Sequence, residues 1–141
     1  MVKRFFLITS FLFLNILCSA DKIFFIYNSQ DDFYTILTDT MHKAIKPETY
    51  PCQLCKLTYN TFNKKKKWKY FLSNLEYEPV FLYKGDKFII ENNISEFPLI
   101  LFGSSNNLDV LLSKKEIDQN SNLDQLINMI DVKLKQYKAV N

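Results

Sequence analysis

The sequence has little glycine, proline or histidine. Its 141 residues include two glycines, four prolines and one histidine. Two glycines are too few for the glycine-rich loop that cradles nucleotide phosphates in G-x-x-x-x-G-K-[ST] proteins, and the chain has no collagen-like repeat or proline-rich linker. Hydrophobic residues make up 48% and charged residues 23%, which is the composition of a globular protein. The length predicts a single domain.

The first 20 residues have the pattern of a secretory signal peptide. Lys3 and Arg4 precede an apolar run at 5–17, and small residues follow as far as Ala20. We predict cleavage after Ala20 and therefore a periplasmic or secreted protein. The apolar run of about 13 residues is shorter than the roughly 20 that span a bilayer, so an uncleaved anchor is less favoured. A lipoprotein cut before Cys18 is a further alternative.

Cleavage would leave the mature chain without arginine. Arg4 is the single arginine, and its loss together with Lys3 lowers the formal net charge from +3 to +1. A nearly neutral chain without guanidinium groups lacks the bidentate contacts that proteins use for phosphate and for guanine. We therefore expect no nucleic-acid partner. We also expect no stable membrane insertion after cleavage, and a monomer.

The mature chain, 21–141, alternates strand-like and helix-like segments. Short apolar runs bounded by polar residues predict strands, and apolar side chains three or four residues apart predict helices. The predicted strands are 22–27, 79–83, 97–102 and 108–112, and the predicted helices are 32–46, 52–62, 64–75, 88–94 and 123–137. Residues 88–94 also fit a hairpin arm. Ser121 and Asp124 have the spacing of a capping box before the last helix.

One cysteine pair, Cys52-Gln53-Leu54-Cys55, opens the second predicted helix, and Pro98 lies at the start of the third predicted strand. With the order of strands and helices, these features resemble the thioredoxin-like fold. The resemblance implies a central mixed sheet of about four strands flanked by helices, with a cis proline at Pro98 beside the redox pair. This chain differs from that fold in the extra predicted helix, 32–46, that precedes the C-x-x-C.

A second resemblance is local. Residues 49–59 (TYPCQLCKLTY), with IFFIYNS at 23–29 and His42-Lys43, resemble a family of small, poorly characterised bacterial proteins, some of which carry a GTPase label. We do not extend that activity to this chain, because it has no phosphate-binding loop.

The C-x-x-C predicts thiol–disulfide chemistry with protein thiols or disulfides as partners. A helix N-terminus stabilises a thiolate through its unpaired N–H groups and partial positive charge. We therefore expect Cys52 to attack and Cys55 to resolve the mixed disulfide, without a cofactor. Whether the chain is an enzyme, and in which direction it would work, is not predicted.

Three other roles of the pair stay open. Export favours a purely structural disulfide. Metal binding would recruit His42 as a third ligand, whereas a closed zinc site has four, so no metal is assigned. Haem attachment is the least favoured role, because Lys56 stands where a C-x-x-C-H motif has histidine.

Two surface features have a functional and a simpler interpretation. His42 could accept the proton of Cys52, with Asp39 orienting the ring, although a solvent-facing histidine is favoured. The run Lys64–Lys67 could contact anionic lipid or nucleic acid, with Trp68 as a wedge. A solvated helix face is favoured there, because the mature chain is nearly neutral.

Overall fold

The computed structural model describes residues 20–29, 52–60, 63–104 and 106–140. The predicted helix 32–46, with Asp39 and His42, lies outside the described residues, as do Cys18 and the rest of the predicted signal peptide before Ala20. Within the described ranges, no helix combines the length and the apolar content that a membrane span requires.

The described chain forms strands and helices close to the predicted segments. They are β1 (Lys22–Tyr27), α2 (Gln53–Thr58), α3 (Lys66–Ser73), β2 (Glu78–Tyr83), α4 (Lys87–Glu91), β3 (Leu99–Ser104), β4 (Asn107–Leu112), α5 (Lys114–Asp118) and α6 (Leu123–Val140). The ambiguous segment 88–94 is helical in part, as α4. The helix α5 was not predicted.

The four strands form one mixed sheet in the order β2-β1-β3-β4. Strand β1 pairs in parallel with β2, from Lys22 opposite Glu78 to Tyr27 opposite Tyr83. Strand β3 runs antiparallel to both of its neighbours, β1 and β4. The predicted four-stranded mixed sheet flanked by helices is confirmed.

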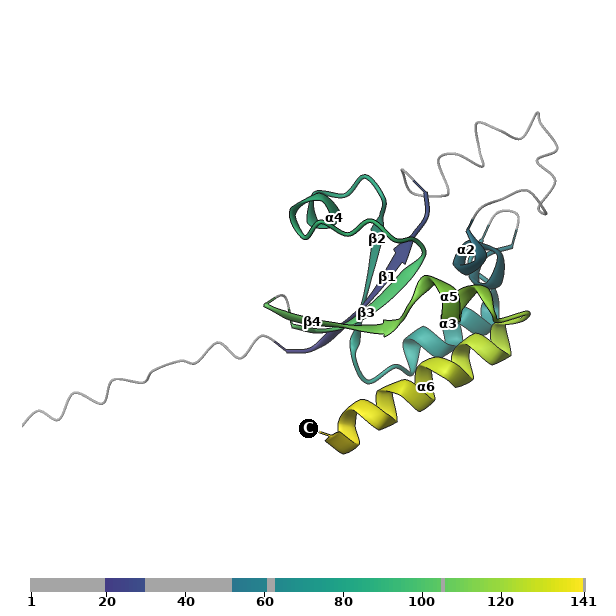
Figure 1. The fold of residues 1–141 in the computed structure, drawn as a ribbon. Helices are drawn as coiled ribbons and strands as arrows, with labels where there is room; N and C mark the ends of the chain where they lie inside the picture. Colours follow the sequence, from purple (N-terminus) through teal and green to yellow (C-terminus); the bar gives the residue numbers. More distant parts are fainter. Residues whose placement is uncertain (1–19, 30–51, 61–62, 105, 141) are drawn as a thin grey trace, which may run out of the picture.

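Alternation along the central strands produces two apolar cores, one on each face of the sheet. On one face, Phe24 and Ile26 of β1 and Leu101 of β3 pack with Ile89 of α4. The opposite face belongs to a larger core, whose sheet residues are Ile23, Phe25, Tyr27, Ile100, Phe102, Leu111 and Leu112. Helices α2, α3, α5 and α6 cover this face, and α4 lies across the sheet from them (Figure 1).

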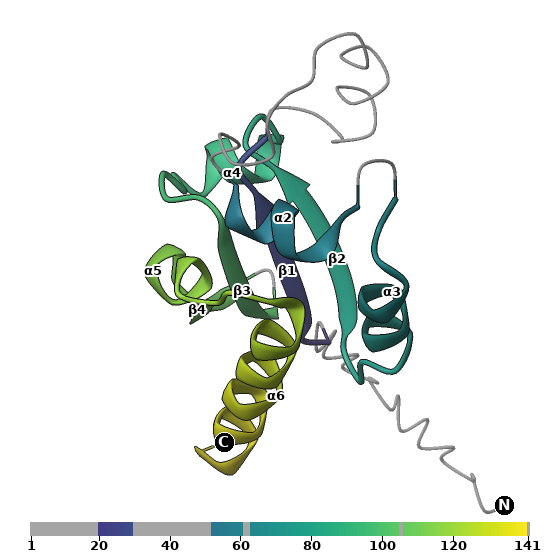
Figure 2. The ribbon, with the colours of Figure 1, turned by 90° about the vertical axis from the view of Figure 1, so that its right-hand side faces the viewer.

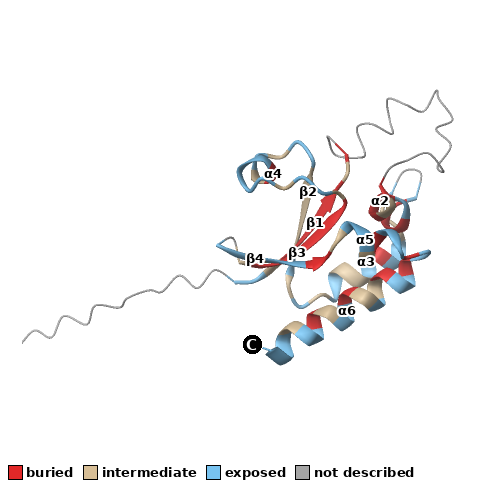
Figure 3. Ribbon diagram, in the orientation of Figure 1, coloured by how far each residue is buried: buried red, intermediate tan, exposed pale blue. Residues whose placement is uncertain are grey.

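Figure 2 shows the molecule from the side of the larger core, so that the helices covering the sheet face the viewer. Helix α2 lies in front of β1 and β2, and α6 runs beside the lower part of the sheet. Strand β1 and the first part of β3 are buried, whereas α6 buries one of its sides and exposes the other (Figure 3).

The end of strand β3, where it pairs with β4, requires a glycine. Gly103 has a φ of +130°, and a Cβ built there would lie 2.2 Å from the carbonyl oxygen of Asn107. Both the backbone angle and the close approach exclude a side chain at this position. One of the two glycines in the chain therefore has a defined structural role.

Helix capping differs from the prediction. The cap of α6 is one residue later than Ser121, because the Oδ1 of Asn122 accepts from the N–H of Gln125 at 3.0 Å. The Gln125 side chain in turn accepts from the N–H of Ser121 at 2.9 Å. The predicted pairing of Ser121 with Asp124 is therefore wrong. The side-chain carbonyl of Asn122 and the longer side chain of Gln125 cap the helix instead.

Candidate redox site

Cys52 and Cys55 form a disulfide at the start of α2. Their Cα atoms are 5.3 Å apart, within the usual range of about 4.4–6.8 Å. Cys52 is the N-cap residue with extended backbone angles, and its Sγ accepts from the backbone N–H of Cys55 at 3.2 Å. Its carbonyl oxygen accepts from the N–H of Lys56 at 3.1 Å. The C-x-x-C spacing therefore places the disulfide across the first helical turn.

Both cysteines are buried. Cys52 is 0% exposed and Cys55 is 2% exposed, and both belong to the larger core together with Tyr27 and Trp68. The sequence predicts an attacking Cys52 at the outer end of the helix, but its sulfur has no exposed surface in this structure. A substrate sulfur can reach it only if the chain around the disulfide moves.

The C-terminal end of α2 is tied to strand β1. Thr58 donates its hydroxyl proton to the carbonyl oxygen of Leu54 at 2.7 Å. Its Oγ1 can therefore accept from the hydroxyl of Tyr27, 3.3 Å away. The ring of Tyr27 also packs edge-on against Tyr59, with centroids 5.8 Å apart. This contact fixes the helix that carries the disulfide against the central strand.

Tyr27 is kept neutral by its surroundings. Burial raises the pKa of its hydroxyl well above the ordinary value, and the hydrogen bond with Thr58 offsets only part of that increase. The indole N–H of Trp68 lowers the pKa slightly but makes no hydrogen bond of normal geometry. Tyr27 therefore serves as an anchor and not as a base at neutral pH.

The N-terminal end of α2 is tied to the segment between α5 and α6. The Nε2 of Gln53, inside the C-x-x-C, donates to the carbonyl oxygen of Asn120 at 2.7 Å. Asn120 is itself buried, and its Nδ2 donates to the carbonyl oxygen of Glu116 at 2.8 Å. Helix α2 therefore has a polar contact at each end, one to the sheet and one to the segment between α5 and α6.

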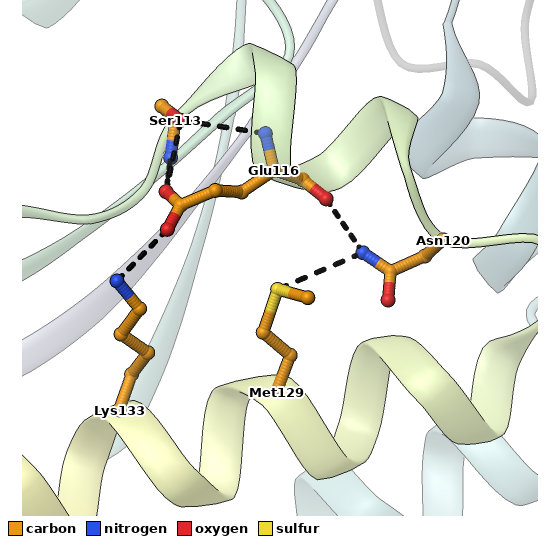
Figure 4. A network of polar contacts seen from close by, with 5 residues as sticks. All are labelled: Ser113, Glu116, Asn120, Met129 and Lys133. Atoms are coloured by element: carbon orange, nitrogen blue, oxygen red, sulfur yellow. Dashed lines mark hydrogen bonds and ion pairs between the residues drawn. The ribbon is translucent and has the colours of Figure 1, made fainter.

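The network continues from Asn120 to α6 (Figure 4). Ser113 and Glu116 form a capping box on α5, and Lys133 of α6 lies 2.8 Å from the Oε1 of Glu116. The hydrogen bond from Lys133, followed by that from the Ser113 backbone, lowers the pKa of Glu116 to about 2. The side chain of Asn120 also lies 3.8 Å from the sulfur of Met129. These contacts join α5 to α6.

Pro98 has the predicted cis peptide bond, at Phe97-Pro98. It is buried and directly precedes β3, whose first residue, Leu99, lies opposite Ile26 near the end of β1. The expected contact between Pro98 and the disulfide stays a prediction. So does the pairing of His42 with Cys52, because His42 lies outside the described residues.

No metal site is formed by the residues that the structure describes, which contain no group of three or more His, Cys, Asp or Glu side chains placed to bind an ion. The predicted alternative ligand set includes His42 and is therefore untested.

The lysine run contacts the protein's own surface. The Nζ of Lys64 lies 3.4 Å from the ring centroid of Phe81, Lys65 donates to the carbonyl oxygen of Lys56, and Lys67 pairs with Asp124. Trp68 is 0% exposed and packs edge-on against a phenylalanine of β1. The wedge interpretation of Trp68 is therefore wrong, because its indole points into the core.

Comparison with protein-family profiles, curated proteins and solved structures finds no match to this chain in any of the three. The site must therefore be interpreted from its own geometry. The sequence did not predict the hydrogen bonds that hold the two ends of α2, from Thr58 to Tyr27 and from Gln53 to Asn120. Ser113-x-x-Glu116 is a capping signal visible in the sequence, whereas nothing local to Tyr27 or Gln53 indicates their distant partners.

Proposed function

We propose that the protein is an exported thiol–disulfide exchange protein on a thioredoxin-like scaffold. The observation that carries the proposal is the disulfide between Cys52 and Cys55 across the first turn of α2. The strand order β2-β1-β3-β4, with β3 antiparallel to its neighbours, supports the scaffold. Export is proposed from the N-terminal sequence pattern.

The exchange follows from the two sulfurs. In the oxidising direction, a thiolate of a dithiol substrate attacks the Sγ of Cys52, the Cys52–Cys55 bond breaks, and Cys55 leaves as a thiolate. The second substrate thiolate then attacks the substrate sulfur of the mixed disulfide and releases Cys52. The substrate loses two electrons, the cysteine pair gains them, and the two substrate protons end on Cys52 and Cys55. In the reducing direction the same steps run backwards.

The local geometry favours Cys52 as the sulfur that forms the mixed disulfide. Its Sγ already accepts a backbone N–H, and the same N–H would stabilise a thiolate once the disulfide opens. Lys56, in the last turn of α2, is exposed. Cys55 lies inside the first turn of the helix and would act as the resolving thiol.

The burial of the pair favours a second candidate, a structural disulfide. Both cysteines are buried in the larger apolar core, which protects their sulfurs from soluble thiols. A disulfide of this kind stabilises the fold by restricting the unfolded chain, and it needs no substrate.

The reduction potential of the Cys52/Cys55 couple separates the two candidates. We expect a value between about −120 and −270 mV if the pair exchanges with substrates, whereas a structural disulfide lies below about −300 mV. The measurement is an equilibrium titration against glutathione or dithiothreitol, with the reduced fraction read by thiol alkylation and mass spectrometry.

A matched pair of variants tests the assigned roles. Cys55→Ser should trap a mixed disulfide with a protein that carries a disulfide, because the Cys52 thiolate attacks that disulfide, one substrate sulfur leaves as a thiolate, and no resolving thiol remains. Cys52→Ser should trap much less, and both variants should lose turnover in an insulin-reduction assay. Equal trapping by both variants would remove the assignment of Cys52, and a wild-type protein without turnover would leave the structural disulfide as the function of the pair.

A further inference from the structure

A cavity of about 700 Å³ opens at one end of the sheet. Its walls come from the ends of β1 and β2, the loop before β3, and α5. The volume is in the range of about 300–1,000 Å³ that is typical of ligand sites. Neither cysteine lines it, so this cavity is separate from the sulfur chemistry proposed above.

Five charged residues line the walls. Three are positive, Lys84, Lys114 and Lys115, and two are negative, Glu96 and Asp118. Lys114 and Asp118 form an ion pair with each other. Among the described residues, Lys84 and Lys115 have neither an ion-pair nor a hydrogen-bond partner for their ammonium groups. Two cations without partners and one acidic side chain, Glu96, therefore set the charge that a ligand meets.

The two lysines extend from fixed backbone positions. The backbone N–H of Lys84 donates to the carbonyl oxygen of Ser29 at 2.8 Å, which holds the ends of β2 and β1 together. Lys115 lies on α5, whose first turn is closed by the capping box of Ser113 and Glu116. A ligand bound between them does not have to order the backbone on either side.

The shape and the lining favour a segment of a polymer over an enclosed small molecule. The charged lining residues are exposed, so the cavity is an open trough. Phe97 is half-buried and offers one apolar wall. An extended peptide could pass through such a trough, with acidic side chains at the lysines and their methylene groups against Phe97.

We propose that this trough binds an acidic peptide segment, with carboxylates held by Lys84 and Lys115. Glu96 limits the affinity by repelling the same carboxylates. The lining residue Gln119 is adjacent to Asn120, which accepts the hydrogen bond from Gln53 of the C-x-x-C. The bound segment therefore lies near the helix that carries the disulfide. This binding goes beyond the proposed function, because it requires no thiol.

The test uses the full chain and a short fluorescent peptide of alternating Glu and Gly without cysteine, measured by fluorescence anisotropy at low salt. Lys84→Gln combined with Lys115→Gln should weaken binding about tenfold, the sum of two partly exposed charge contacts. The matched control is Lys66→Gln combined with Lys69→Gln, two exposed lysines of α3 outside the trough. It removes the same charge and should change affinity less than about twofold.

A third variant should change the affinity for the peptide in the opposite direction. Glu96→Gln should strengthen binding about two- to threefold, since it removes a repulsive carboxylate from the same walls. Circular dichroism spectra identical to that of the wild type confirm that the variants are folded. Because the peptide has no cysteine, the result is independent of the reduction potential.

Three results would overturn the proposal. Equal weakening by the α3 control pair would mean that net charge, and not the trough, attracts the peptide. Equal affinity for a peptide with Gln in place of Glu would exclude recognition of carboxylates. Full displacement of the peptide by inorganic phosphate at concentrations comparable to that of the peptide would indicate a site for small anions instead of a peptide.

Discussion

Helices α2 and α6 pack against the same face of the sheet but are held there by different kinds of interaction. Helix α6 has 18 residues and buries four apolar side chains, those of Leu123, Leu126, Ile130 and Leu134. Helix α2 has six residues and carries a disulfide across its first turn. Its two ends are tied by side-chain hydrogen bonds, through Gln53 to Asn120 and through Thr58 to Tyr27.

The difference follows from helix length. A helix shorter than about 12 residues is marginal by itself in water, so α2 depends on individual contacts at defined positions. A long amphipathic helix is stabilised by repeated burial, at about 1.5–3 kcal/mol for each large apolar side chain. The loss of one polar contact should therefore affect α2 locally, whereas the loss of one buried side chain of α6 should destabilise the whole domain.

The largest effect is expected in α6. Ile130 is 0% exposed, and Ile130→Ala should lower the free energy of unfolding by about 2–5 kcal/mol because it leaves a cavity in the core. Val132→Ala, at a side chain 43% exposed on the same helix, should change it by less than about 0.5 kcal/mol. Urea unfolding followed by circular dichroism measures both variants. Similar losses in the two would contradict the stabilisation of α6 by its buried side.

An intermediate effect is expected where α2 meets β1. Tyr27→Phe removes the hydrogen bond to Thr58 and should lower the free energy of unfolding by about 1 kcal/mol. Tyr70→Phe, at a side chain 72% exposed, is the control and should be neutral. Hydrogen exchange of the α2 amides should increase in Tyr27→Phe more than that of the α6 amides. An equal increase in both helices would show that the contact is not local to α2.

Tyr27 also predicts an alkaline dependence with a definite sign. Its folded-state pKa is raised above the ordinary value of 10.0, so the neutral hydroxyl stabilises the fold below pH 10, and this contribution is lost as the pH rises above 10. In Tyr27→Phe the decline of stability above pH 10 should be shallower.

The smallest effect is expected where α5 meets α6. The folded-state pKa of Glu116 is lowered from 4.5 to about 2, so its carboxylate stabilises the fold above pH 4.5, and this contribution is lost as the pH falls toward 2. Glu116→Gln should cost about 0.5–1 kcal/mol at pH 7, because the pair with Lys133 is partly exposed. It should also flatten the decline in stability between pH 4.5 and 2. If stability declines between pH 4.5 and 2 equally in Glu116→Gln and in the wild type, Glu116 is not the cause of that decline.

The elements that the sequence predicted well are those whose pattern is repeated. Strand β1 is a continuous apolar run, and α6 repeats buried residues at three- and four-residue intervals, so neither depends on distant contacts for its identification. Helix α5 was missed because its five residues are too few for a periodic pattern. Its signal was Ser113 with Glu116 three residues later, a capping box that precedes no long apolar run.

The sequence predicted the cysteine pair but not its environment. Cys52 and Cys55 are visible as a C-x-x-C, and Pro98 was assigned its cis bond by resemblance. The burial of both cysteines could not be predicted, because it depends on a core assembled from residues that are distant in the sequence, Tyr27 and Trp68 among them. For the same reason, nothing near Gln53 indicates that its amide binds Asn120.

Trp68 gives the protein an optical reporter of its own. It is the single tryptophan of the chain and is fully enclosed, with its ring edge-on to Phe25 and stacked on Phe71. Its emission therefore comes entirely from an apolar site between α3 and the central strand, and shifts to longer wavelength when water reaches the indole. Because Trp68 shares the larger core with residues of α2 and α6, the emission reports on the sheet face that both helices cover.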